Sequence, residues 1–135
     1  MSLSPKVLVR SATAVLAAAI VVVSMLPMPQ PQMDKVPLAD KFAHGLAYLA
    51  LGFMLFASQL PGPRPRLVLA AVLGSLIFGG LIELVQPLAG RHRELGDLVA
   101  DLAGSSVGAL LALALVRPLK RLLLPAGRGG RGKYS

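Results

Sequence analysis

Residues 67–82 read LVLAAVLGSLIFGGLI. Ser75 is the one polar side chain in this stretch, so a helix formed by these residues has no face suited to water. About 20 apolar residues are needed to cross the ~30 Å hydrocarbon core of a bilayer. Together with its flanks, at residues 66–89, the stretch is long enough, and we expect it to form a helix that crosses a membrane.

Three further apolar stretches lie at residues 7–26, 41–60 and 97–116. The whole 135-residue chain is 55% hydrophobic, with a mean hydropathy of +0.70. All eleven prolines lie near or beyond the ends of these stretches, and proline marks helix boundaries because it lacks an N–H. The sequence therefore predicts an all-α integral membrane protein, a four-transmembrane-helix bundle in one domain at 1–124. A basic, disordered, glycine-rich tail is expected at 125–135.

The first apolar stretch also has features of a secretory signal peptide. Lys6 and Arg10 precede it, as the charged region of a signal peptide would. However, residues 27–31 read PMPQP, which is a poor cleavage site because cleavage requires small residues. We therefore expect a retained helix.

Basic residues predict the orientation of the bundle. With four spans, the N-terminus, the second loop and the tail share one side and carry ten basic residues, whereas the opposite side carries four. The positive-inside rule then places both termini in the cytoplasm. The net charge of +8 is typical of nucleic-acid binders, but a juxtamembrane tail attracted to anionic lipid accounts for it. We expect membrane lipids as partners and no nucleic acid.

Acidic residues follow a different pattern, which the insertion rule does not explain. All six fall on the side opposite the termini or in the helix ends nearest to it: Asp34, Asp40, Glu83, Glu94, Asp97 and Asp101. Ionisable groups inside a membrane are unfavourable unless they face the bundle interior or water and have a partner. These acids therefore need a structural or functional reason.

Helical spacing places the polar residues on shared faces. Lys41, His44 and Tyr48 share one face of the second helix, and Glu83 and Gln86 share one of the third. The fourth helix has Asp97 and Asp101 on one face. We expect all seven to converge in a single polar pocket open to the outside. Ligand-binding candidates are Lys41, Tyr48, Gln86, Arg91 and Arg93, and catalytic candidates are His44, Glu83, Asp97 and Asp101.

Individual residues in this set also have plainer interpretations. Asp97 could cap the fourth helix, whereas Asp101 lies past any capping position. Glu83 needs a partner, for which Arg91 and His44 are the candidates. A divalent metal on His44, Glu83, Asp97 and Asp101 is conceivable, but this set has a single histidine and no dedicated spacing, and the chain has no cysteine, so we expect neither a metal nor a cofactor. A purely structural polar network that joins three helices remains an alternative.

Small residues allow the helices to approach closely. Gly104-x-x-x-Gly108 continues the face that carries Asp97 and Asp101, and Ser75-x-x-x-Gly79 lies on the third helix. Motifs of this type let helix backbones pack together in membranes. We therefore expect Gly104 and Gly108 to be packing residues.

The polar residues resemble the signatures of a known family. Residues 40–52, DKFAHGLAYLALG, resemble the D-K-x-x-H-x-x-x-Y-x-x-L-G signature of VanZ-like membrane proteins. Glu83, Gln86, Arg91, Asp97, Gly104 and Gly108 follow a second signature, E-x-x-Q…R…D-x-x-x-N-x-x-G-x-x-x-G. The resemblance covers residues 40–108, about half of the chain. Two residues depart from it: Asp101 replaces an asparagine, and Gly45 replaces a frequent phenylalanine.

The resemblance implies a multi-pass protein of the bacterial cytoplasmic (inner) membrane that acts at the cell envelope. VanZ itself is associated with low-level resistance to the glycopeptide antibiotic teicoplanin. We therefore expect a site that binds or modifies a lipid-linked envelope precursor or an amphipathic glycopeptide. An intramembrane enzyme, with His44 and Glu83 as acid and base, and a structural or transporter subunit are the alternatives. The sequence leaves open whether the chain is an enzyme.

Overall fold

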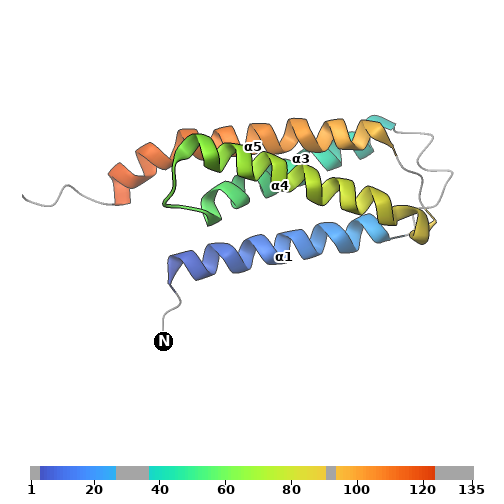
Figure 1. Ribbon diagram of the computed structural model, residues 1–135, viewed down its shortest axis with the longest axis horizontal. Coiled ribbons are helices and arrows are strands. Elements are labelled where there is room, and N and C mark those ends of the chain that lie inside the picture. The colour runs from blue at the N-terminus through green and yellow to red at the C-terminus, as the bar shows by residue number, and fades with distance from the viewer. Residues whose placement is uncertain (1–3, 27–36, 91–93, 124–135) are drawn as a thin grey trace, which may run out of the picture.

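The computed structural model describes residues 4–26, 37–90 and 94–123. It contains four long helices, α1 (Pro5–Met25), α3 (Pro37–Ser58), α4 (Arg64–Val85) and α5 (Leu95–Leu123), and a short 3-10 helix, η1 (Gln86–Ala89), after α4 (Figure 1). Each long helix is long and apolar enough to cross a membrane. The prediction of four such helices in an all-α fold is confirmed. The predicted tail at 125–135 lies outside the described residues.

The helix boundaries differ from those predicted, because several prolines lie inside helices rather than beyond them. Pro5 and Pro37 begin their helices and Pro65 is the second residue of α4. The first helical turn tolerates proline, since its N–H has no intrahelical acceptor. Pro118 lies within α5, which continues to Leu123 instead of ending at 116.

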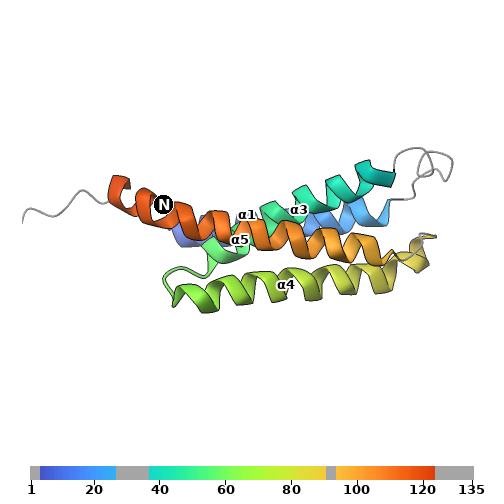
Figure 2. The ribbon, with the colours of Figure 1, turned by 90° about the horizontal axis from the view of Figure 1, so that it is seen from above.

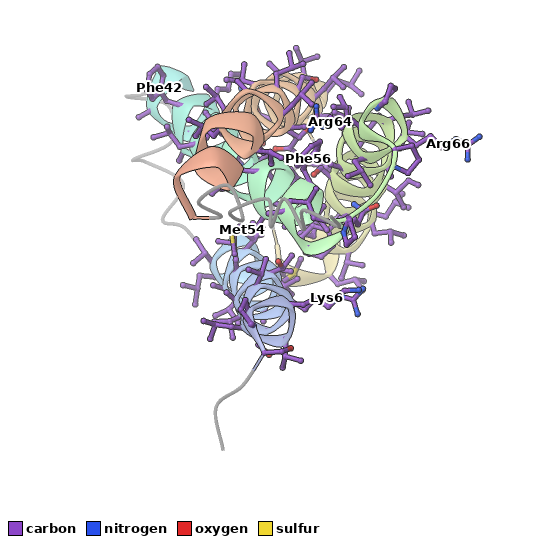
Figure 3. The ribbon with its side chains drawn as sticks, turned by 90° about the vertical axis from the view of Figure 1, so that its left-hand side faces the viewer. Lys6, Phe42, Met54, Phe56, Arg64 and Arg66 are labelled. Carbon is purple, nitrogen blue, oxygen red and sulfur yellow. The ribbon has the colours of Figure 1, made fainter. Side chains whose placement is uncertain are left out.

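Consecutive helices run in opposite directions, so α1 is parallel to α4 and α3 is parallel to α5, and α1 begins and α5 ends at the same end of the bundle (Figure 1). Figure 2 shows α5 alongside both α3 and α4, with its C-terminal end extending beyond the start of α4. The view along the bundle in Figure 3 shows α1 standing apart from the other three helices. The molecule is therefore a three-helix core of α3, α4 and α5, with α1 added on one side.

The outside of the bundle is apolar, and the core is small. Phe56 is fully buried among α3, α4 and α5 and packs with Leu67, Ala71, Ala109 and Ala112 (Figure 3). Phe42, by contrast, projects outward and is 70% exposed. Many other leucines and valines are also exposed, as expected of helices whose surroundings are hydrocarbon rather than water.

Candidate functional site

Polar side chains collect at one end of the bundle, where α1 and α4 end and α3 and α5 begin (Figure 1). Of the predicted site residues, the structure brings together Lys41, His44 and Tyr48 from α3, Glu83 from α4, Gln86 from η1 and Asp97 and Asp101 from α5. Glu94, which precedes α5, joins them. We call these eight residues the polar network. Arg91 and Arg93, the two predicted ligand-binding arginines, lie outside the described residues.

Asp101 lies at the centre of the network and is 1% exposed. Its Oδ1 lies 3.0 Å from His44 Nδ1, and its carboxylate also accepts a hydrogen bond from the Tyr48 hydroxyl. The His44 and Tyr48 rings are parallel, with their centroids 6.4 Å apart. Two side chains of α3 are thereby fixed to one carboxylate of α5.

Asp97 lies one helical turn before Asp101 and is 3% exposed. Its Oδ2 is 3.7 Å from His44 Nε2, and its Oδ1 is 3.6 Å from Lys41 Nζ. Oδ1 is buried and has no hydrogen-bond partner among the described residues. Asp97 does not cap α5: the helix begins at Leu95, which places Asp97 in the first turn, and its N–H donates to Glu94 O at 3.0 Å.

Glu83 is 9% exposed, and of its two predicted partners His44 does not bind it, while Arg91 lies outside the described residues. Its Oε2 accepts a hydrogen bond from the Glu94 backbone N–H at 3.2 Å. The Gln86 amide nitrogen donates to Oε1 at 3.1 Å in the orientation that pairs both side chains. His44, one of the two predicted partners, is instead held by Asp101 and faces Asp97, because α5 rather than α4 packs closely against this part of α3.

Two acidic residues that the sequence reasoning passed over belong to this end of the molecule. Glu94 Oε2 forms an ion pair with Lys41 Nζ at 2.7 Å, so it joins the start of α5 to the first turns of α3. Asp40 lies four residues before His44 on the same face of α3, and both residues border a cavity between α1 and α3. The i, i+4 spacing of Asp40 and His44 could have predicted from the sequence that the two side chains lie on one face of the helix.

Glycines make room for the network. The Asp101 carboxylate and the Tyr48 hydroxyl lie where a side chain on Gly79 of α4 would be. Gly104 and Gly108 of α5 lie directly against the α3 backbone at Gly45 and Leu49, respectively. This close approach of α3 and α5 sets the short distance between His44 and Asp101.

Two cavities flank the network instead of the single polar pocket expected. One, of ≈190 Å³, lies between α1 and α3 and is bordered by Asp40, His44 and Tyr48, with apolar side chains such as Ile20 on its other walls. The other, of ≈340 Å³, is an apolar groove between α3 and α5 with Lys41 at one end. The carboxylates of Glu83, Asp97 and Asp101 lie in the packed interior, between these spaces.

No protein-family model, no curated protein and no solved structure matches this chain. The chemistry of the site therefore rests on its geometry. The network offers a fixed imidazole, several carboxylates and one ammonium group beside two largely apolar cavities. Such an arrangement can bind an amphipathic molecule, transfer a proton or hold a cation.

Proposed function

We propose that this protein is a VanZ-like, multi-pass protein of the bacterial cytoplasmic membrane whose polar network binds a lipid-linked or amphipathic molecule of the cell envelope. One observation carries the proposal: His44 and Tyr48 of the network border the cavity between α1 and α3, Lys41 borders the groove between α3 and α5, and the other walls of both spaces are largely apolar. A ligand that has both a polar head and a hydrocarbon portion is complementary to this combination. The signature residues in 40–108 support the family.

The distribution of charge supports an orientation with both termini in the cytoplasm. Lys6, Arg10, Arg64 and Arg66 lie at the end of the bundle where α1 begins, and every described acid lies at the opposite end. Figure 3 shows Lys6, Arg64 and Arg66 at the first of these ends. The positive-inside rule then makes the polar network face the outside of the cell, where envelope precursors and glycopeptides are found.

The groove between α3 and α5 supports the ligand class. Its walls are formed by Leu46, Leu49, Val107 and other apolar residues, and Lys41 is the one charged residue among the described residues that line it. An acyl or isoprenoid chain fits such walls, and a phosphate or carboxylate head can form a charge-assisted hydrogen bond with the ammonium. Carboxylates of the network are suited to amines and sugar hydroxyls.

Native mass spectrometry of gently purified protein tests this proposal. We expect a bound lipid-like species on the wild-type chain, and its loss in Lys41→Gln. Lys6→Gln removes the same charge at the opposite end of the bundle and serves as the matched control, which should retain the ligand. A wild-type protein that carries no ligand, or equal loss in both variants, would contradict the proposal. Expression of the chain in a teicoplanin-susceptible host then tests the link with resistance.

Glu83→Gln and Asp101→Asn separate this function from a purely structural network. Both substitutions are nearly isosteric and remove one negative charge. If the network binds ligand, the variants should lose the co-purifying species while keeping the melting temperature within a few degrees of the wild type. Variants that melt earlier but retain the ligand would support the structural alternative.

A second candidate function is an acid/base enzyme that acts on an envelope lipid. The His44–Asp101 pair favours it, because a carboxylate bonded to Nδ1 orients an imidazole and stabilises its protonated form. Product analysis of membranes from cells that express the wild type or His44→Gln distinguishes an enzyme from a binding protein. An enzyme would generate a modified lipid that is absent with the variant.

A further inference from the structure

Among the described residues, carboxylates outnumber ammonium groups at the end of the bundle that carries the polar network. Among the described residues this end has five carboxylates and one ammonium group, that of Lys41. Carboxylates removed from water are costly unless a cation or several donors compensate them. This excess is only a starting point, because acidic groups often cluster without binding an ion.

Three side chains in this region have the geometry of ligands to one ion. Asp40, His44 and Asp97 each offer one ligand atom, and these atoms all lie within 4.8 Å of one another. Asp40 and His44 come from successive turns of α3, and Asp97 comes from α5. Ligands contributed by two packed helices form a site that exists only in the folded protein.

The imidazole is oriented as in known metal sites. His44 Nδ1 is engaged by Asp101 Oδ1 at 3.0 Å, so the lone pair on Nε2 is directed away from Asp101. Metal-bound histidines almost always donate their other ring N–H to a carboxylate, carbonyl or water. The distance from Nε2 to Asp97 Oδ2, 3.7 Å, is too long for a hydrogen bond. It suits two ligands that each lie roughly 2.0–2.2 Å from a shared ion.

The Asp97 side chain provides independent evidence for a missing partner. It is 4% exposed, and its Oδ1 has no hydrogen-bond partner among the described residues. Lys41 Nζ, at 3.6 Å, is beyond hydrogen-bond distance and is bound instead to Glu94 at 2.7 Å. The charge of this buried carboxylate is therefore only partly compensated by Lys41, and a cation bound at Oδ2, on the side of His44, would compensate it further.

We propose that Asp40, His44 Nε2 and Asp97 bind one divalent transition-metal ion of the Zn²⁺ or Mn²⁺ type, with Asp101 holding the imidazole in position. One imidazole and two carboxylates suit these ions. Asp40 and His44 border the ≈190 Å³ cavity between α1 and α3, through which an ion can enter and a further ligand can reach it. The sequence led us to expect no metal, because the pairing of Asp40 with His44 and Asp97 depends on the packing of α3 against α5.

This inference is independent of the proposed ligand, since it concerns binding of the metal alone. It does compete with the enzyme alternative, because an Nε2 that binds a metal cannot also act as a base. Metal binding without any co-purifying lipid would support this site while leaving the proposed function unsupported. The opposite result would overturn the metal site alone.

Equilibrium dialysis against Zn²⁺ and against Mn²⁺, with elemental analysis, tests the site in tag-free full-length protein that has been stripped with EDTA in detergent. We expect saturable binding of one ion per chain. Asp40→Asn should weaken binding at least ~10-fold while leaving the buried residues in place. Asp101→Asn, which removes no proposed ligand but alters the carboxylate that orients the imidazole, should weaken it by about 10–100-fold.

Two matched variants complete the experiment. Asp34→Asn removes a negative charge that precedes α3 in the chain without removing a proposed ligand, and His92→Gln removes the other histidine of the chain. Both should bind one ion with affinity close to that of the wild type. Absence of saturable binding, or equal weakening in Asp34→Asn and Asp40→Asn, would overturn the proposal, since equal weakening would reflect diffuse attraction to acidic groups. Equal weakening in His92→Gln and Asp40→Asn would also overturn it.

Discussion

Helix α3 contacts its two neighbours, α5 and α1, in different ways. Against α5, backbone meets backbone at Gly45, Leu49 and Gly52, because glycine or serine lies opposite each of these residues. Against α1, the contacts are made by side chains and leave the cavity of ≈190 Å³. In the apolar segment of α5, 33% of the residues are buried, against only 11% in that of α1.

This difference shows which helix–helix distance must be held closely. The distances within the polar network depend on the α3–α5 contact, which fixes His44 beside Asp101 to within hydrogen-bonding distance. The α1–α3 contact instead encloses the cavity of ≈190 Å³, and the size of a cavity can change slightly without loss of a specific contact. We therefore expect substitutions between α3 and α5 to cost far more stability than substitutions between α1 and α3.

The largest effect should come from Gly108→Ala. A Cβ at this position would meet the backbone of Leu49 and Phe53, and backbone cannot yield as a flexible side chain can. We expect the free energy of unfolding, measured by SDS titration in mixed micelles, to fall by about 3 kcal/mol. Gly80→Ala is the matched control: its Cβ meets nothing within 4 Å, so it should be neutral or stabilising by up to ~1 kcal/mol. Equal effects would mean that α3 and α5 are not in close contact.

Asp101→Ala should have the second-largest effect. It leaves His44 and Tyr48 without their shared acceptor in the interior, at a cost of about 2 kcal/mol. Asp101→Asn retains an oxygen acceptor for His44 and should cost about half as much. The same titration measures both, and an alanine variant as stable as the asparagine variant would argue against the hydrogen bonds from His44 and Tyr48 to Asp101.

A smaller loss is expected from Gly79→Ala. Its Cβ would meet the Asp101 carboxylate and the Tyr48 hydroxyl, which are side-chain atoms that can shift. We expect a cost of about 1 kcal/mol. Because the neighbouring Gly80→Ala experiences no such contact, the difference between the two variants isolates the packing of α4 against the network. No difference would place Gly79 away from Asp101.

The smallest effect should be seen with Thr13→Val in α1. The Thr13 hydroxyl donates to Val9 O at 2.8 Å within its own helix and lies 3.4 Å from Met54 O of α3. Hydrogen bonds between membrane helices average about 0.6 kcal/mol, and we expect a loss no larger than this. A loss comparable with that of Gly108→Ala would show that α1 is held as firmly as α5.

Much of the fold could be predicted from the sequence, because long apolar runs and prolines are local signals. The spacing of Lys41, His44 and Tyr48 also predicted their common face correctly. The role of Asp97 was less predictable, since the start of α5 two residues earlier moved it from a cap position into the first turn. Glu94 was passed over because its ion pair with Lys41 joins residues that are distant in the chain.

By itself, the sequence determined that there are four apolar helices and that the acids lie at the end opposite the termini, because hydropathy and charge order are properties of the chain. Tertiary structure alone decided that Asp101 holds His44, that Glu83 accepts from the Glu94 backbone, and that Asp40, His44 and Asp97 share one corner. The physical reason is that such pairings depend on how closely two helices approach. That distance depends on which glycines of one helix lie against the other helix, and this arrangement is known only from the tertiary structure.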